Sequence, residues 1–365
     1  MKSLKAILQG DAMIPVAGFE AAWTKYLSQA GTDVLAGNWE SDWDKLQYRR
    51  LEVEKHGPGI ESVPELVQEK GGDRELLAGL FVPISADVMD AMPQLRVAGV
   101  CRAGVENVDV PAATERGIAV FHVMGRNAHA VSDYAVGMMI AEARNIARAF
   151  NAIKSGTWRK TFSNSDIVPE LHGRTIGLVG FGHIGGLVAK KLSGFDVNVI
   201  VYDPFTPEEH LREAGVEPVS LDELLTRADI VSLHARLSDD NRGMIGAEQI
   251  AKMKQTAILI NTARAGLIDE DALAKALEAG QIAGAALDVF ETEPIPADSP
   301  FLALDNVTLT THLAGTTADA LSNSPFLLME DIARLLQGEA PRGLVNPEVL
   351  GDPRFAEWLS AVKKG

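Results

Sequence analysis

A glycine-rich turn between an apolar run and a helical pattern constrains this chain more than any other feature. The stretch TIGLVGFGHIGGLVAKKL places Gly180, Gly182 and Gly185 at G-x-G-x-x-G spacing. A second apolar run follows and ends in VYDPF, which places Asp203 at its end. A strand, a glycine turn, a helix and a second strand with a terminal carboxylate form the dinucleotide-binding fingerprint. The alternative, glycines that merely form a turn, does not account for this context.

Each glycine of this turn has a separate physical role. Gly180 permits the tight turn, Gly182 lets the backbone approach a pyrophosphate, and Gly185 allows close helix–strand packing. The helix that follows presents unpaired N–H groups and a partial positive charge. Asp203 should accept hydrogen bonds from the adenine-side ribose, and its charge would repel a 2′-phosphate. The residues after it in VYDPF carry no cation, so the pattern favours NAD over NADP.

The surrounding sequence predicts a parallel sheet covered by helices on both faces. Between residues 174 and 313, short apolar runs rich in β-branched residues alternate with amphipathic stretches. The expected strands are Thr175–Val179, Val197–Tyr202, Ile230–His234, Ala257–Asn261, Gly284–Val289 and Val307–Thr311. The expected helices are Gly185–Ser193, Leu221–Arg227, Ala247–Lys252 and Asp269–Ala279.

The first 120 residues show a weaker version of the same alternation. The expected strands are Lys5–Leu8, Leu80–Pro83, Arg96–Val100 and Ala119–Phe121. The stretch Gly37–Glu54, with two tryptophans and many charges, matches no element clearly. Helical spacing of apolar residues predicts two further helices, Ala128–Ile153 and Pro325–Leu336.

Length and charge bound the remaining possibilities. A chain of 365 residues suggests about two domains. The balance of 34 basic against 50 acidic residues gives a net charge of −16, which makes nucleic acid and anionic membrane surfaces poor partners. The single cysteine, Cys101, excludes an internal disulfide and any cysteine-based metal cluster. No signal peptide is apparent, so we expect a cytoplasmic protein. Because no cluster of cysteines is present, we also expect no bound metal.

Four polar side chains follow later apolar runs. They are Arg264 in INTARAG, Asp288 and Glu293 in ALDVFETEP, and His312 in LTTHLAG. The carboxyl ends of parallel strands face the ligand crevice. Arginine can hold a carboxylate bidentately, and histidine can donate a proton to a developing alkoxide. Taken singly, each could cap a turn, remain solvated or be structural, but their order after the fingerprint indicates hydride transfer to a 2-keto acid.

The chain resembles the D-isomer-specific 2-hydroxyacid dehydrogenase family, which includes phosphoglycerate, glycerate, D-lactate and formate dehydrogenases. The resemblance runs from about Leu95 to Asn346. It rests on GLVGFGHIG, SLHARLSDDNRGMIG, AILINTARAGLIDEDAL, AALDVFETEP and THLAG, which occur in the family's order. It implies an NAD-dependent oxidoreductase that interconverts a small 2-keto acid and a D-2-hydroxy acid.

The resemblance also implies roles for individual residues. Arg264 would bind substrate, and Glu293 would orient His312, the acid–base. The cofactor residues would be Gly180, Gly182, His183, Ile184, Gly185, Asp203, Ala235, Thr262, Ala263, Asp288 and Gly315. Backbone N–H groups of the CRAGVENVD loop would hold the substrate carboxylate, and they belong to Ala103, Gly104 and Val105.

The family's architecture implies a discontinuous chain path. Residues 1–124 and 316–365 would form a smaller, flavodoxin-like α/β substrate-binding domain. Residues 125–315 would form a Rossmann-type NAD-binding domain with a parallel sheet. The family usually dimerises through the nucleotide domain, which implies a homodimer here.

Several positions depart from the family pattern. Thr311 and Arg236 replace the usual prolines, and the CRAGVENVD loop is about two residues shorter than the common form. No lysine or arginine occurs between residues 76 and 95, where a phosphate-binding cation can sit in phosphoglycerate enzymes. A phosphorylated substrate is therefore less expected, although Arg102 or Arg126 could compensate.

Two alternative functions remain at this point. One is an NADP-preferring glyoxylate or hydroxypyruvate reductase, which the role given to Asp203 opposes. The other is a non-enzymatic, NAD-sensing protein similar to transcriptional corepressors of this fold. The presence of Arg264, Glu293 and His312 argues against a purely binding role without excluding it.

Overall fold

The computed structural model describes residues 3–31, 33–167 and 169–363. The chain forms two compact units. Unit 1 combines Met1–Arg126 with Thr317–Gly365, and unit 2 is Asn127–Thr316. The first two and last two residues of the expected substrate-binding segments lie outside the described residues. Among the described helices, none is long and apolar enough to cross a lipid bilayer.

Unit 2 contains a seven-stranded sheet in the order β12-β11-β10-β9-β6-β7-β8, and every neighbouring pair is parallel. The strands are β6 (Thr175–Val179), β7 (Asn198–Tyr202), β8 (Glu217–Pro218), β9 (Ile230–Leu233), β10 (Ile258–Asn261), β11 (Gly284–Leu287) and β12 (Val307–Leu309). The strand order reverses direction between β6 and β9. Such a switch point opens a crevice at the carboxyl ends of the strands, where ligands bind.

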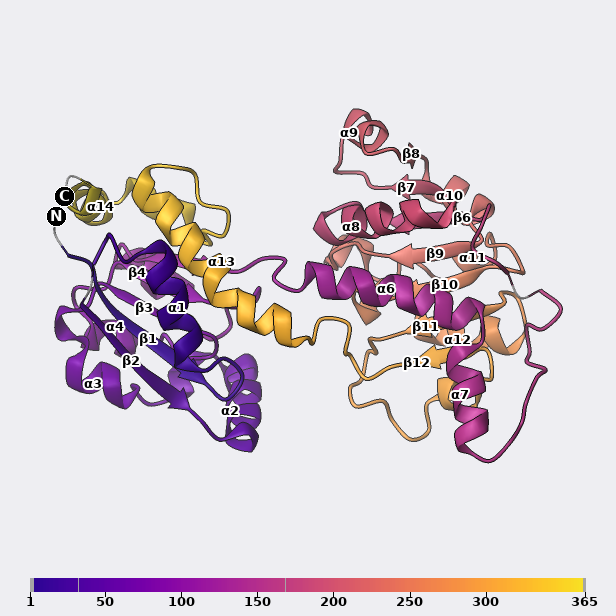
Figure 1. Ribbon diagram of the computed structural model, residues 1–365, viewed down its shortest axis with the longest axis horizontal. Coiled ribbons are helices and arrows are strands. Elements are labelled where there is room, and N and C mark those ends of the chain that lie inside the picture. Colours follow the sequence, from indigo (N-terminus) through magenta and orange to yellow (C-terminus); the bar gives the residue numbers. More distant parts are fainter. Residues whose placement is uncertain (1–2, 32, 168, 364–365) are drawn as a thin grey trace. The chain divides into compact units, whose positions relative to one another are not determined.

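Helices cover both faces of this sheet (Figure 1). They are α6 (Ala128–Ala143), α7 (Ile146–Lys154), α8 (His183–Leu192), α9 (Glu208–Glu213), α10 (Leu221–Arg227), α11 (Ala247–Ile250) and α12 (Glu270–Glu278). On one face, α6 and α8 pack on the sheet through an apolar cluster that includes Met139 and Val188. On the other face, α10 and α12 contribute Leu224 and Leu273 to a second cluster. Burial on both faces explains why the strands are almost wholly apolar.

Unit 1 contains a five-stranded parallel sheet in the order β2-β1-β3-β4-β5. This is the flavodoxin-like strand order. The strands are β1 (Lys5–Asp11), β2 (Asp33–Glu40), β3 (Leu76–Gly79), β4 (Val97–Val100) and β5 (Ala119–His122). The helices are α1 (Val16–Tyr26), α2 (Trp43–His56), α3 (Glu65–Lys70), α4 (Ala86–Ala91), α5 (Val110–Glu115), α13 (Ala318–Gln337) and α14 (Pro353–Lys363).

The C-terminal segment returns to complete unit 1. Leu328 of α13 lies so close to β4 that a Cβ on Gly99 would stand 3.0 Å from its side chain. The Asn346 side chain makes two hydrogen bonds to the backbone at the start of β5. Its Oδ1 accepts from the Val120 N–H at 2.8 Å, and its Nδ2 donates to the Ile118 carbonyl at 2.9 Å. The described part of the C-terminal segment, from α13 to α14, therefore contributes to the core and the hydrogen bonding of the first sheet.

Two expected elements of unit 1 differ in the structure. Leu80–Pro83 is not a strand; β3 ends at Gly79, just before it, and uses the fully buried run LLAG. The expected helix Pro325–Leu336 begins earlier, at Ala318, with the Thr317 side chain as its N-cap. A proline inside a helix is normally unfavourable, but Pro325 is buried and faces α1, so tertiary packing offsets the lost hydrogen bond.

The expected helix Ala128–Ile153 is divided into α6 and α7. The break occurs at Asn145, which has a left-handed φ of 56°. Asparagine tolerates this conformation better than most residues.

The unassigned stretch Gly37–Glu54 contains the end of β2 and most of α2. Its charges are satisfied locally: Arg49 stacks on Trp39 at 4.0 Å and pairs with Glu61 at 2.6 Å and with Glu40 at 3.1 Å. Because α2 is largely polar, it carries little of the apolar periodicity that identifies a helix from sequence.

A buried ion pair joins α6, α7 and β12 in unit 2. The Arg148 guanidinium donates to the Glu142 carboxylate, and both side chains are almost fully buried. Thr308 donates to the other Glu142 oxygen at 2.6 Å, and Arg148 also donates to the Asn145 side chain at 2.6 Å. Burial raises the pKa of Glu142, whereas the charge of Arg148 opposes that shift.

We predict that Arg148→Met lowers the free energy of unfolding by about 3–5 kcal/mol, because it leaves the buried Glu142 carboxylate without its cation. Denaturation in urea measures this loss. The double variant Arg148→Met/Glu142→Leu should regain much of it, since no charge is then left unpaired. Arg144→Met, at an exposed arginine on the same helix pair, is the matched control; an equal effect in the control would contradict the prediction.

Candidate active site

The expected site residues of unit 2 follow the ends of adjacent strands. The glycine turn follows β6, Asp203 follows β7 and Ala235 lies just beyond β9. Thr262, Ala263 and Arg264 follow β10, Asp288 follows β11, and His312 and Gly315 follow β12. Because these strands are parallel neighbours, all of these residues lie at one edge of the sheet, beside the switch point.

The glycine turn has the steric features of a phosphate cradle. Gly180 has a φ of 97°, and a Cβ there would lie 2.6 Å from the Ala235 nitrogen. A Cβ on Gly185 would lie 2.3 Å from the Gly180 carbonyl oxygen. At Gly182, by contrast, a Cβ would meet nothing within 4 Å. The first and third glycines are therefore required by the protein's own packing, whereas the second borders open space.

The amino terminus of α8 provides donors for this space. The helix begins at His183, directly after Gly182, and no side chain caps it. The N–H groups of His183 and Ile184 belong to the first turn and have no carbonyl partner within the helix. Together with the helix dipole they suit an anion such as a pyrophosphate.

Asp203 links the glycine turn to the end of β7. Its Oδ2 accepts from the Phe181 N–H at 2.6 Å, and its Oδ1 accepts from Phe205 at 2.8 Å and Thr206 at 3.0 Å. A carboxylate has about four acceptor positions. Three are therefore used internally, and one remains for a ribose hydroxyl.

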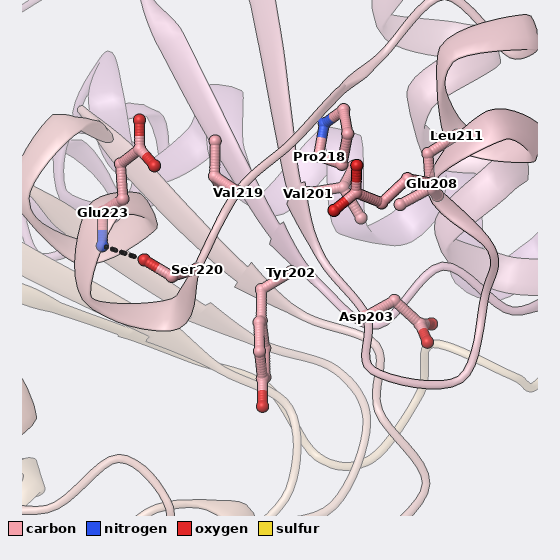
Figure 2. A pocket seen from close by; sticks show the side chains of 9 residues that line it. All are labelled: Val201, Tyr202, Asp203, Glu208, Leu211, Pro218, Val219, Ser220 and Glu223. Carbon is pink, nitrogen blue, oxygen red and sulfur yellow. Dashed lines mark hydrogen bonds between the residues drawn. The ribbon is translucent and has the colours of Figure 1, made fainter.

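A cavity of about 430 Å³ lies beside Asp203, between β7, β8, α9 and α10. Figure 2 shows the Glu208 and Glu223 carboxylates on either side of Val219, with Asp203 on the turn after Tyr202. Glu208 and Glu223 are paired with Arg212 and Arg227, respectively, at 2.6 Å each. Asp203 is therefore the carboxylate of this region that has no cation as its partner among the described residues, and its charge disfavours a 2′-phosphate.

His312 and Glu293 form a hydrogen-bonded pair. The His312 Nδ1 lies 2.8 Å from Glu293 Oε2, and the other Glu293 oxygen accepts from the Phe290 N–H at 3.0 Å. Donation from Nδ1 to the carboxylate leaves Nε2 as the reactive nitrogen. Both side chains are partly exposed, so Nε2 is open to a substrate.

Asp288 holds the loop that carries His312. It is fully buried, and its oxygens accept from the Thr310 hydroxyl at 2.6 Å and from the Leu313 and Ala314 N–H groups at 2.9 Å each. His312 itself has a φ of 56°, a conformation that non-glycine residues adopt only when surrounding contacts support it. Asp288 therefore positions the histidine, a role that its place in the sequence does not reveal.

Asn261 and Asn127 are two further residues that the sequence motifs did not single out. The buried Asn261 accepts from the Ala263 N–H at 3.0 Å and donates to the Arg264 carbonyl at 2.9 Å, which shapes the loop that presents Arg264. The Asn127 amide lies against Gly315, where a Cβ would stand 2.2 Å from Nδ2. The role of neither asparagine can be recognised from the sequence, because a single asparagine at the end of a helix or strand is common.

Arg264 and Thr262 occupy the same strand end in different environments. The Arg264 side chain is exposed and donates to the Ala263 carbonyl at 2.6 Å, so its remaining donors face solvent. The Thr262 hydroxyl is buried and has no partner among the described residues. An orphan polar group of this kind at a ligand crevice fits a polar ligand.

His234 lies at the end of β9 beside the glycine turn. Its Nε2 is 3.0 Å from the Ser232 hydroxyl, and Nδ1 is buried without a partner among the described residues. Burial lowers the pKa of His234 to about 4, so the imidazole is neutral near pH 7. A Cβ on Gly185 would lie 3.7 Å from the His234 Cβ, which gives His234 a packing role in the turn.

The expected substrate loop belongs to unit 1. Ala103, Gly104 and Val105 follow β4 at the carboxyl edge of that sheet. The Ala103 carbonyl accepts from His122 Nδ1 at 2.7 Å. The buried Asn107 anchors the end of the loop by donating to the Val82 carbonyl at 2.9 Å.

Within the described part of the chain, no group of three or more His, Cys, Asp or Glu side chains is arranged to hold a metal ion.

Comparison with known proteins identifies relatives from one family of dehydrogenases. A family model described as D-isomer specific 2-hydroxyacid dehydrogenase, NAD binding domain, matches residues 136–314. A glyoxylate reductase of Korarchaeum cryptofilum is 40% identical over 288 residues, which cover 78% of this chain and 87% of that protein. A D-3-phosphoglycerate dehydrogenase of Archaeoglobus fulgidus is 38% identical over 305 residues, covering 83% of this chain and 56% of that protein.

The fold has close counterparts among solved structures. The NAD-complexed form of a D-isomer specific 2-hydroxyacid dehydrogenase from Lactobacillus delbrueckii ssp. bulgaricus superimposes with a TM-score of 0.74 at 24% identity, covering 94% of this chain and 100% of that one. The chain belongs to the D-isomer specific 2-hydroxyacid dehydrogenase family. It is an NAD-dependent oxidoreductase of that family, which confirms the predicted family, fold class and cofactor.

The local geometry fits this cofactor. The open space at Gly182, the free N–H groups at the start of α8, the remaining Asp203 acceptor and the unpartnered Thr262 hydroxyl supply complementary groups for a dinucleotide.

We predict that Gly182→Ala weakens NADH binding about tenfold or more, a loss of at least ~1.4 kcal/mol, without lowering the melting temperature. The added methyl group would enter the space assigned to the pyrophosphate while touching no protein atom. Fluorescence titration with NADH and thermal unfolding measure the two quantities. Gly194→Ala, at another glycine with open space around it, should change neither; equal NADH affinity in the two variants would contradict the assignment.

Proposed function

We propose that His312, Glu293 and Arg264 carry out the interconversion of a small 2-keto acid and a D-2-hydroxy acid. The observation that supports this most is the His312–Glu293 hydrogen bond at the sheet edge that also carries the glycine turn. When bound, NADH supplies the hydride. The remaining tasks are to hold the substrate, to donate a proton and to keep both groups oriented, and this chain's side chains provide for each.

His312 is assigned as the acid–base. During reduction, its Nε2 proton passes to the carbonyl oxygen as that oxygen becomes an alcohol, and during oxidation the proton returns. Glu293 accepts from Nδ1, which fixes the orientation of the imidazole ring and leaves Nε2 to exchange the proton. Asp288 contributes indirectly, because it holds the backbone on the C-terminal side of His312.

Arg264 is assigned to the substrate carboxylate. Its exposed guanidinium offers a planar pair of donors that matches a carboxylate and polarises the neighbouring carbonyl. In unit 1, the backbone N–H groups of Ala103, Gly104 and Val105 are proposed to bind a substrate carboxylate. Backbone donors in a loop anchored by Asn107 can do so without a further charged side chain.

The assignment of cofactor residues follows from their positions. Gly180, Gly182, His183, Ile184 and Gly185 would surround the pyrophosphate. Asp203 would accept from the ribose, and its negative charge would repel the 2′-phosphate of NADP. The nicotinamide half would lie near a set of residues at the carboxyl ends of β9 to β12, namely Ala235, Thr262, Ala263, Asp288 and Gly315.

We predict that His312→Ala lowers kcat by a factor of about 10²–10⁴, as expected for loss of an acid–base, whereas Arg264→Ala mainly raises KM. NADH absorbance during reduction of a panel of 2-keto acids measures both effects. His172→Ala, at an exposed histidine of unit 2, is the matched control. Undiminished turnover in His312→Ala would overturn the catalytic assignment.

A homodimer through unit 2 is also proposed. Helix α7 buries only Arg148, whereas its apolar residues Ile146, Phe150 and Ile153 are exposed. Phe150 is 66% exposed, and Trp158, shortly after the helix, is 77% exposed. An apolar face of this kind marks an interface, and the usual association of this family through its nucleotide domain favours a second copy as the partner.

We predict that Phe150→Lys converts the protein to a monomer, because it places a charge in the centre of this apolar face. Light scattering coupled to size-exclusion chromatography measures the mass in solution. Leu350→Lys, at an exposed leucine of unit 1, should leave the dimer intact. A monomeric wild-type protein, or a dimeric Phe150→Lys variant, would refute this interface.

The remaining proposals concern partners and compartment. The net charge of −16 disfavours nucleic acid and anionic membranes as partners. The free, buried Cys101 fits a reducing compartment, and we propose the cytoplasm.

A further inference from the structure

The loop that carries Glu293 has few attachments to the rest of unit 2. Residues 290–294 form no helix or strand, and apart from Phe290 they are exposed. Phe290 packs against the apolar cluster on one face of the sheet. Among the described residues, hydrogen bonds and ion pairs join this loop to other segments at three side chains, which are those of His312, Glu270 and Arg242. The position of Glu293 therefore depends on a small number of contacts.

Glu270 accepts a hydrogen bond from the backbone of this loop. It is the first residue of α12, and its Oε1 accepts from the Glu291 N–H at 2.8 Å. The Asp269 side chain caps α12, so the Glu270 carboxylate is not needed for that purpose. Burial raises the pKa of Glu270, the hydrogen bond from Glu291 opposes this shift, and the charge of Glu293 adds to it. The Glu270 carboxylate thus lies near Glu293, and its hydrogen bond serves the loop.

Arg242 holds the same loop residue by its side chain. The Arg242 Nη1 lies 3.2 Å from Glu291 Oε1, and about half of each side chain is exposed. An exposed ion pair of this kind contributes little to stability. Arg242 also lies against the segment that presents Arg264, because a Cβ on Gly266 would stand 2.7 Å from its Nη1. Glu291 is therefore held to that segment both by its backbone and by its side chain.

These contacts connect two segments that carry reactive side chains. Glu270 lies six residues after Arg264, and Glu291 lies two residues before Glu293. The preceding strands, β10 and β11, are paired through their backbones, but this pairing ends before either loop begins. Beyond the strands, the hydrogen bond from Glu291 to Glu270 fixes the distance between the two segments. Because a displacement of reacting groups by 1 Å can cost about 10²-fold in rate, this bond suits a positioning role.

We propose that Glu270 is a positioning residue of the reaction, which holds the loop of Glu293 so that Glu293 keeps its hydrogen bond to His312. This inference rests on the proposed function, in which His312 exchanges the proton and Arg264 binds the substrate carboxylate. Glu270 itself touches neither substrate nor cofactor and exchanges no proton. Without its hydrogen bond, the loop backbone has no fixed distance to the segment of Arg264, and the pair of Glu293 and His312 spends less time in its reactive orientation.

Three substitutions of Glu270 separate its hydrogen bond from its charge. Glu270→Ala removes both. Glu270→Asp keeps the charge but is one methylene shorter, so it cannot reach the Glu291 N–H. Glu270→Gln keeps an acceptor oxygen at the same distance without the charge. We expect kcat to fall by about 10–10²-fold in the first two variants and to remain close to the wild-type value in Glu270→Gln. KM and NADH affinity should change little, since Glu270 binds neither ligand.

Steady-state kinetics with NADH measure kcat and KM. Glyoxylate, pyruvate and hydroxypyruvate are tested as substrates, and the most rapidly reduced one is used throughout. Fluorescence titration measures NADH affinity, and thermal unfolding establishes that each variant is folded. Asp271→Ala is the matched control, because Asp271 lies in the same first turn of α12 and, among the described residues, makes no hydrogen bond to the loop. It should keep the wild-type kcat.

A double-mutant cycle tests whether Glu270 acts through Glu293. Glu293→Ala removes the partner of His312 and lowers kcat by itself. Residues that act through one another are not additive. We therefore expect Glu270→Ala to lower kcat by only about twofold or less when Glu293→Ala is already present. A general loss of structure would give the same factor in both backgrounds.

The outcomes separate this inference from the proposed function. Wild-type kcat in Glu270→Ala, equal losses in Glu270→Ala and Glu270→Gln, or the same factor in both backgrounds overturns the positioning role. Each of these results leaves the assignment of His312 standing. An unchanged kcat in Glu293→Ala, or no turnover of any 2-keto acid by the wild-type protein, overturns the proposed function and this inference with it. If Glu270→Ala does not fold, Glu270→Asp takes its place in each comparison, because aspartate is favourable in the first turn of a helix.

Discussion

The parallel pairing of β6 with β9 is the constraint on which the candidate site depends. The strand order runs outward in both directions from this pair, so the loops after β6 and β9 diverge and leave a crevice. The glycine turn fits there only because Gly180 and Gly185 have no side chain: a Cβ on either would overlap neighbouring backbone. Close packing and ligand access thus have the same structural origin.

Around this crevice, buried polar groups position exposed ones. Asp288 and Asn261 are buried, and their hydrogen bonds go to the backbones of the loops that present His312 and Arg264. The left-handed backbone at His312 is costly for a non-glycine residue, and the Asp288 contacts compensate for it. His312 and Arg264 can remain partly exposed because the residues that hold their loops, Asp288 and Asn261, are buried.

Buried charges in unit 2 are completed within the protein. Arg148 and Glu142 neutralise each other and join α6, α7 and β12. Because neither charge is left unpaired, the cost of removing them from water is partly offset by their attraction and by their further hydrogen bonds to Asn145 and Thr308. This pair therefore serves the stability of the unit that carries the glycine turn.

The amino-acid sequence alone determined the elements with strong periodicity and the motifs with a unique context. The strands of unit 2 and the family were predictable because buried parallel strands are continuous apolar runs and because the glycine turn allows few alternatives. Tertiary structure alone decided the start of α13, the break at Asn145 and the extent of β3, since packing there overrides local preference. It also decided the supporting role of Asp288, because its hydrogen-bond partners Thr310, Leu313 and Ala314 are distant in sequence and meet it only through the pairing of β11 with β12.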